Sequence, residues 1–212
     1  MIRPTPFHFY TERRLVILTG LRARNLLELL ITMKEVPGSS IFYHTHHLFL
    51  SHHFEKPVVY NEFAIWISRA LQEEALSEKV SAIDLRTFTS IRDLRNELIS
   101  LTQSHLEATD EKSRDCLPGD EFHFCRSKSF ILPTGVVAND IPDFFAKLPV
   151  ITNVSLYFHF LEARLRLGRQ TNDFSQWLES CGEQDLAQAI NSLDPYLLTL
   201  DELKEEILKL GR

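Results

Sequence analysis

Two stretches of the chain alternate apolar and polar residues, which is the pattern of β-strands. They cover residues 6–18 and 121–132, and each has a polar centre. The centres are Thr11-Glu12-Arg13 in the first stretch and Arg126-Ser127-Lys128 in the second. A polar centre between two apolar arms is typical of a turn, so we expect a β-hairpin in each stretch.

Each predicted hairpin is followed by helices. A Thr-Gly pair ends the hairpin and is expected to start the first helix, at 20–34 in one stretch and at 136–147 in the other. The clearest helices come next, at about 40–53 and 154–167, where apolar residues recur with a helical period. Most of the remaining chain also has the helical period, so the sequence predicts a mainly helical α+β protein.

The second half of the chain repeats the first. Residues 7–44 align with 122–159 without a gap, and eight positions are identical. The match resumes after a four-residue length difference, where Asn61-Glu-Phe-x-x-Trp66 corresponds to Asn172-Asp-Phe-x-x-Trp177. An ordered match through a whole unit indicates an internal tandem duplication.

The duplication predicts the domain organisation. We expect copy one at residues 1–106, a polar linker at 107–120, and copy two at 121–212, or one fused domain. The fold class is therefore predicted as two hairpin-plus-four-helix units. Related units often pack about a pseudo-two-fold axis, as identical subunits do in symmetric dimers. If the two hairpins pair, they would form a small four-stranded sheet.

Composition and charge argue against several classes of protein. Hydrophobic residues make up 44% and charged residues 25% of the chain, which argues against disorder. The net charge of −6 leaves no basic excess for binding nucleic acid. No apolar run has the roughly 18 residues of a membrane span, and no signal peptide is recognisable. Three widely spaced cysteines favour a reduced, cytoplasmic protein.

Several strings resemble an uncharacterised prokaryotic family, a domain of unknown function. They are Ser40-Ile-Phe-Tyr-His-Thr-His-His47, Asn61-Glu-Phe-Ala-Ile-Trp66, Phe124-Cys-Arg-Ser-Lys-Ser129 and Tyr157-Phe-His-Phe-Leu-Glu-Ala-Arg-Leu-Arg166. The resemblance covers nearly the whole chain and implies a bacterial or archaeal origin. It implies no activity, cofactor or catalytic residue.

A histidine cluster is the main candidate site. Five of the nine histidines lie within residues 44–53, and His44 and His47 would share one helix face. The aligned positions in copy two hold His159 and Glu162. Three imidazoles and a carboxylate would suit Zn²⁺, Fe²⁺ or Mn²⁺. The alternatives are a metal-free polar ligand pocket and a purely structural role among the aromatic residues of these helices.

Other residues are candidates for ligand binding. Glu62 and Asp173, at helix N-termini, are expected near the histidines as second partners or bases. The Phe-His-Phe strings at 7–9 and 122–124 should send each histidine to the face opposite its phenylalanines. The candidates for ligand binding also include the histidines of these strings, His8 and His123. The cations near the Thr-Gly turns are the last candidates: Arg13, Arg126 and Lys128. Arg166 is assigned to a solvated helix face.

The sequence favours a binding protein over an enzyme. It contains no phosphate-binding, dinucleotide-binding, metalloprotease or serine-hydrolase motif. The leading hypothesis is a non-catalytic cytoplasmic module that binds a small polar ligand or a protein partner at the pseudo-two-fold interface. The alternative is a metal-dependent hydrolase or oxidase that uses the histidine and glutamate cluster between the copies.

Overall fold

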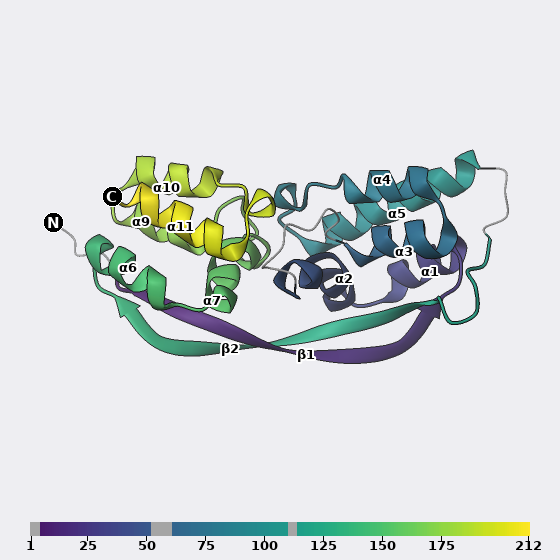
Figure 1. Ribbon diagram of the computed structural model, residues 1–212, viewed down its shortest axis with the longest axis horizontal. Coiled ribbons are helices and arrows are strands. Elements are labelled where there is room, and N and C mark those ends of the chain that lie inside the picture. The colour runs from purple at the N-terminus through teal and green to yellow at the C-terminus, as the bar shows by residue number, and fades with distance from the viewer. Residues whose placement is uncertain (1–4, 52–60, 110–113) are drawn as a thin grey trace. The chain divides into compact units, whose positions relative to one another are not determined.

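The computed structural model describes residues 5–51, 61–109 and 114–212. The protein is mainly helical, with one two-stranded sheet formed by β1 (Phe7–Ala23) and β2 (Phe122–Ala138) (Figure 1). The helices after β1 are α1 Leu26–Glu35, α2 Gly38–Ser51, α3 Glu62–Leu71, α4 Glu74–Ser81 and α5 Ile91–Ala108. Those after β2 are α6 Ile141–Lys147, α7 Asn153–Tyr157, α8 Ala163–Leu167, α9 Asp173–Ser180, α10 Gln184–Ser192 and α11 Leu200–Leu210.

A π-helical segment, Phe158–Glu162, joins α7 to α8. With α7 and α8 counted as one helix, five helices follow each strand in the described ranges, one more than predicted. The predicted helices at 40–53 and 154–167 are confirmed within three residues. No helix of the described ranges is both long and apolar enough to cross a membrane.

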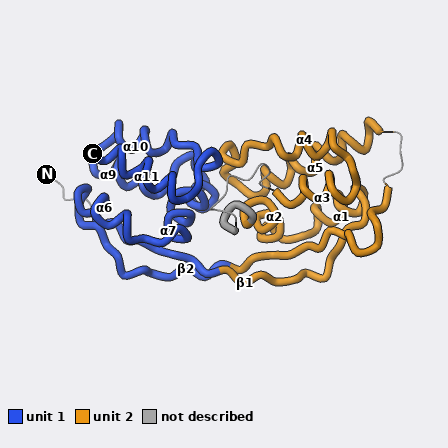
Figure 2. The backbone as a smooth tube through the Cα atoms, viewed as in Figure 1, with its two compact units in different colours: residues 1–13, 52–56, 129–212 blue, residues 14–51, 57–128 orange. Residues whose placement is uncertain are grey.

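The described chain divides into two compact units, coloured separately in Figure 2. Unit 1 contains residues 5–13 and 129–212, and unit 2 contains residues 14–51, 61–109 and 114–128. Each strand therefore begins in one unit and ends in the other. As a result, unit 1 combines the start of β1 with the helices α6–α11, and unit 2 combines the start of β2 with α1–α5. The sequence-based division at 1–106 and 121–212 stays a prediction about the repeat.

The predicted hairpins are wrong. Each stretch forms part of one continuous strand of 17 residues, and β1 and β2 run antiparallel to each other (Figure 1). The polar centres lie where each strand passes from one unit to the other, between residues 13 and 14 and between 128 and 129. Arg13, Arg126 and Lys128 are exposed there. The alternation pattern cannot distinguish this passage between units from a turn. Among the described residues, a two-stranded sheet takes the place of the four-stranded sheet that paired hairpins would have formed.

The Thr-Gly pairs lie inside the strands rather than at helix starts. Gly20 and Gly135 have φ of 78° and 79°, a region that favours glycine. The hydroxyl of Thr19 donates to the carbonyl of Phe124 at 2.6 Å, and that of Thr134 donates to the carbonyl of Phe9 at 2.7 Å. Both bonds join the two strands.

The helices α1 and α6 begin later than the sequence predicts. Side chains of Asn25 and Asp140 accept from the N-terminal backbone of α1 and α6 and so fix these starts. Pro142 lies in the first turn of α6, where its missing N–H is tolerated, so the helix begins late and needs no kink.

Aromatic residues form the core of each unit. In unit 1, Phe7 and Phe9 of β1 pack against Phe144 of α6 and Phe174 and Trp177 of α9. Burying one such side chain contributes about 1.5–3 kcal/mol. β1 thus contributes aromatic side chains to a core whose helices lie far from it in the sequence.

Unit 2 has the corresponding core. Phe122 and Phe124 of β2 pack against Phe63, and Phe122 also contacts Trp66; both partners lie on α3. In both units the second phenylalanine of the strand is 1% exposed, whereas His8 and His123, one residue earlier, are exposed. The predicted orientation of the Phe-His-Phe strings is confirmed.

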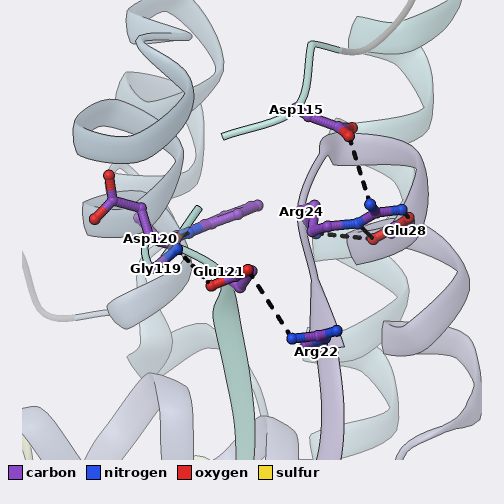
Figure 3. A network of polar contacts seen from close by, with 8 residues as sticks. Arg22, Arg24, Glu28, Asp115, Gly119, Asp120 and Glu121 are labelled. Atoms are coloured by element: carbon purple, nitrogen blue, oxygen red, sulfur yellow. Dashed lines mark hydrogen bonds and ion pairs between the residues drawn. The ribbon is translucent and has the colours of Figure 1, made fainter. Parts of the chain in front are cut away.

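A polar network holds the segment that leads into β2 (Figure 3). The carbonyl of Arg24 accepts from the backbone N–H of Cys116 at 2.7 Å, and the guanidinium of Arg24 lies 3.8 Å from Asp115. Arg22 lies 4.0 Å from Glu121, whose carboxylate also accepts from the backbone of Gly119 at 3.0 Å. These contacts join residues 115–121 to the end of β1 within unit 2 and set where β2 begins.

Candidate functional site

A serine and a histidine on α2 hold one residue of β2. Ser40 and His44 are one helical turn apart. The Ser40 hydroxyl donates to the carbonyl of Cys125 at 2.6 Å, and the N–H of Cys125 donates to Nε2 of His44 at 2.9 Å. The pair therefore satisfies both backbone groups of a single strand residue, which a neighbouring strand would otherwise do.

The same arrangement occurs in unit 1. The Ser155 hydroxyl donates to the carbonyl of Tyr10 at 2.6 Å, and the N–H of Tyr10 donates to Nε2 of His159 at 2.8 Å. We call each pair a Ser-His clamp: Ser40 with His44 in unit 2, and Ser155 with His159 in unit 1. The clamped residues, Cys125 and Tyr10, are aligned positions of the two strands.

A carboxylate fixes the ring of each clamp histidine. Nδ1 of His44 lies 2.7 Å from Glu62, and Nδ1 of His159 lies 2.7 Å from Asp173. Because Nε2 accepts a backbone proton, Nδ1 carries the ring proton and donates it to the carboxylate. Both carboxylates lie in the first turn of a helix, as predicted. The sequence thus anticipated these pairs but not the backbone that the histidines bind.

A tryptophan makes a further backbone contact in each unit. The indole N–H of Trp66 donates to the carbonyl of Asp120 at 2.6 Å, and that of Trp177 donates to the carbonyl of Thr5 at 2.7 Å. Each accepting residue lies five positions before the clamped residue of the same strand. The strand is therefore held at both ends of its Phe-His-Phe string.

The candidate metal ligands are distributed over both units. His44 and His47 belong to unit 2, and His159 and Glu162 belong to unit 1. Both ring nitrogens of His44 and of His159 are already engaged. His47 stacks on Tyr43 at 4.7 Å, and burial lowers its pKa. Over the part of the chain that is described, no three His, Cys, Asp or Glu side chains are grouped to hold a metal ion.

Unit 1 contains an open groove beside its clamp, with a volume of about 660 Å³. Its polar side chains include His8, Arg166, Asp173, Gln176 and Ser180, and its apolar wall includes strand and helix residues. The wall residues are Pro6, Phe7, Tyr10, Ile131, Phe158 and Trp177. A concave apolar site with a few convergent polar groups is the usual form of a small-molecule site.

Arg166 is the cation of this groove. Its Nη2 lies 2.5 Å from Asp173, and its guanidinium carbon lies 4.5 Å from the centre of the Phe158 ring. Asp173 thus joins Arg166 to His159. The π-helical segment Phe158–Glu162 lies directly before the helix that carries Arg166, and such segments are frequent at functional sites. The sequence assignment of Arg166 to a solvated face missed this role; its place next to a clamp histidine is a tertiary feature.

Four of the other candidates lie apart from the groove. His123, Arg13, Arg126 and Lys128 are exposed strand residues and do not line it. His8 does line it, next to the clamped Tyr10. The repeat alignment contained a signal for the clamp, because Ser40 and Ser155 were among its identical positions.

The geometry defines a class of protein: a mainly helical protein whose Ser-His clamps hold a shared two-stranded ribbon. The chain belongs to the family of unknown function DUF5752, whose model matches residues 4–212. It is similar to the solved structure of OrfY from Thermoproteus tenax, with 27% sequence identity and a TM-score of 0.83. That match covers 98% of this chain and 94% of that chain. No curated protein matches the chain significantly.

Proposed function

We propose that the protein is a non-catalytic binding module that holds a small polar ligand with an anionic group in the groove of unit 1. The observation that carries this proposal is the placement of Arg166 on the groove. A guanidinium has five N–H donors in a planar fork that matches a carboxylate or phosphate. Contact with Asp173 and with the Phe158 ring holds the fork in place, and 35% of the side chain is exposed.

The neighbouring groups support a polar ligand of small size. His8, Gln176 and Ser180 line the same groove and can donate to or accept from a ligand. When the ungapped register of residues 7–44 and 122–159 is carried forward, Ser51 takes the position of Arg166. A cation at this position is therefore specific to unit 1, and we expect one ligand per chain.

The chemistry of the site argues against catalysis. A histidine whose Nε2 accepts a backbone N–H must break that bond before it can take a proton or bind a metal. This holds for His44 and His159 alike. Burial raises the pKa of the Cys125 thiol, and the charge of Glu62 raises it further, so the reactive thiolate is disfavoured. These observations also weigh against the metal-dependent alternative.

We also propose that the chain arose by duplication of one unit that formed a symmetric dimer. Support comes from contacts that recur at aligned positions: the clamps, the carboxylates, the tryptophans and the threonine bonds between strands. The exchange of strands is reciprocal, since copy one gives its strand to the helices of copy two and receives the other strand. Reciprocity of this kind is the connectivity of a two-fold dimer. A reduced, cytoplasmic location fits the three unbonded cysteines.

The ligand proposal is tested by NMR titration of the full chain with inorganic phosphate and with acetate. We expect saturable shifts at His8, Gln176 and the Arg166 guanidinium. Arg166→Gln should abolish them, whereas the control Arg169→Gln, at another exposed arginine of the same region, should not. Shifts that are absent, or that persist in Arg166→Gln, would overturn the anionic ligand. Saturable binding of a protein partner with no response to either anion would overturn it in favour of a partner surface.

A further inference from the structure

Each helical set binds a strand through contacts that do not depend on chain connectivity. In unit 1 the bound strand starts in copy one, and all the helices belong to copy two. The residues that form the clamp and tryptophan bonds are separated by 145 to 172 positions in the sequence. The only covalent route from this strand to its helices runs through the whole of unit 2.

The bound strand has a definable signature. Two phenylalanines, two residues apart, fill the aromatic core, as Phe7 and Phe9 do in unit 1. The clamp binds the backbone N–H and C=O of the residue that follows, and the tryptophan binds a carbonyl five residues before it. The clamped residue is tyrosine in one unit and cysteine in the other. The clamp therefore recognises extended backbone and is indifferent to that side chain.

We propose that the helical set of unit 1 can accept this strand from a second copy of the chain, which yields a strand-exchanged dimer. A second copy offers the same two phenylalanines and the same backbone groups, so exchange conserves the aromatic, clamp and tryptophan contacts of the strand. Domain swapping of this kind is a low-cost route to a dimer. The balance is set by the effective concentration of the chain's own strand, which the connection through unit 2 determines. Exchange is therefore favoured at high protein concentration and during refolding.

Exchange would make the groove a composite site. Pro6, Phe7, His8 and Tyr10 line the groove from the strand, whereas Arg166 and Gln176 line it from the helices. In the exchanged dimer the first group comes from one copy and the second group from the other. The strand contacts that carry this inference are independent of the ligand proposed above.

The test is complementation between two full-length variants. A strand-deficient variant, Phe7→Ala/Phe9→Ala, keeps intact helices in unit 1. A helix-deficient variant, Ser155→Ala/His159→Ala, keeps an intact strand. Refolded together, they can form one native unit 1 per pair, so native mass spectrometry should show heterodimers several-fold above the dimer level of either variant alone. A mixture that stays as monomeric as its components would overturn the proposal.

A matched control uses the other clamp. Ser40→Ala/His44→Ala changes unit 2 and leaves unit 1 complete, so it should form no more heterodimer with the strand-deficient variant than wild type does. If the strand-deficient variant forms as much heterodimer with Ser40→Ala/His44→Ala as with Ser155→Ala/His159→Ala, the heterodimer does not come from strand capture by unit 1. That result would overturn the proposal. A second measurement needs no variant: co-refolded ¹⁵N-labelled and unlabelled wild-type chains should give mixed-mass dimers that increase with concentration. Monomers alone at every concentration would also overturn it.

Discussion

The clamp histidine of unit 1 offers a direct test of what holds the strand. Replacing His159 with phenylalanine retains an aromatic ring but removes both of its hydrogen bonds. The N–H of Tyr10 and the carboxylate of Asp173 then lose this partner. Replacing His159 with alanine removes the ring as well.

The two substitutions differ in magnitude for a structural reason. Loss of the partner of a fully buried backbone N–H costs about 1–3 kcal/mol. The bond of the Tyr10 N–H is only part-buried, so we expect about 1 kcal/mol for His159→Phe. Asp173 keeps its contact with Arg166, which limits the cost on that side. In wild type the ring also packs against Phe7 and Phe174. Its removal leaves a cavity, so we expect about 3–5 kcal/mol for His159→Ala.

The assay combines urea unfolding with amide hydrogen exchange. Urea unfolding of both variants and of wild type gives the change in the free energy of unfolding. Exchange at the Tyr10 amide tests the clamp itself, because the bond to Nε2 protects that proton in wild type. We expect the Tyr10 amide to lose protection in His159→Phe. The matched control is His44→Phe, which should expose the amide of Cys125 and leave Tyr10 protected.

Two results would refute this reasoning. A stability of His159→Phe within 0.5 kcal/mol of wild type, a change about as small as that of an ordinary surface substitution, would mean that the clamp bonds contribute nothing measurable. Retained protection of Tyr10 in both His159 variants would mean that another group holds the strand.

Three further predictions concern titration, backbone strain and metal. Burial, and after it the charge of Arg14, lowers the pKa of His46 to about 3 from the ordinary 6.5. Because the unfolded state binds this proton more readily, stability should fall as pH drops from 6.5 towards 3, by about 1.4 kcal/mol per pH unit over the steepest part. Urea unfolding at pH 7 and 4.5 should show a smaller fall in His46→Phe, and an equal fall would contradict the assignment. Gly135→Ala should destabilise by about 1–2 kcal/mol in the same assay, because its φ of 79° is strained for alanine and no atom lies within 4 Å of the added carbon. An unchanged midpoint would argue against that backbone conformation. Protein purified without chelator should contain zinc, iron and manganese well below one ion per chain by elemental mass spectrometry. Stoichiometric metal that disappears in His44→Ala/His159→Ala would restore the metal site.

Local sequence determined much of the helical structure. Asparagine is a preferred N-cap residue, and the side chains of Asn61 and Asn172 accept from the first turns of α3 and α9. A cap is a contact within four residues, so a short stretch of sequence contains all the information it needs. The burial of Phe7 and Phe9 and the exposure of His8 followed from the period of a strand in the same way.

The course of the strands was decided by tertiary structure. Alternation predicts an extended backbone but is the same for two short strands and for one long strand. The polar centre around Thr11-Glu12-Arg13 therefore suggested a turn, whereas it marks the passage of β1 between two helical sets. Which helices cover a strand depends on contacts between residues 54 to 172 positions apart, and no local pattern contains them.

The candidate site was also predicted only in part from the sequence. The sequence by itself identified His44 and His159 as equivalent and placed Glu62 and Asp173 near them, because a duplicated pattern repeats its contacts. Only the tertiary structure decided what the rings bind. An imidazole nitrogen can accept a backbone N–H or bind a metal ion, and the choice depends on what lies opposite it in space. Here the opposite group is the backbone of a strand that is distant in the sequence, β2 for His44 and β1 for His159.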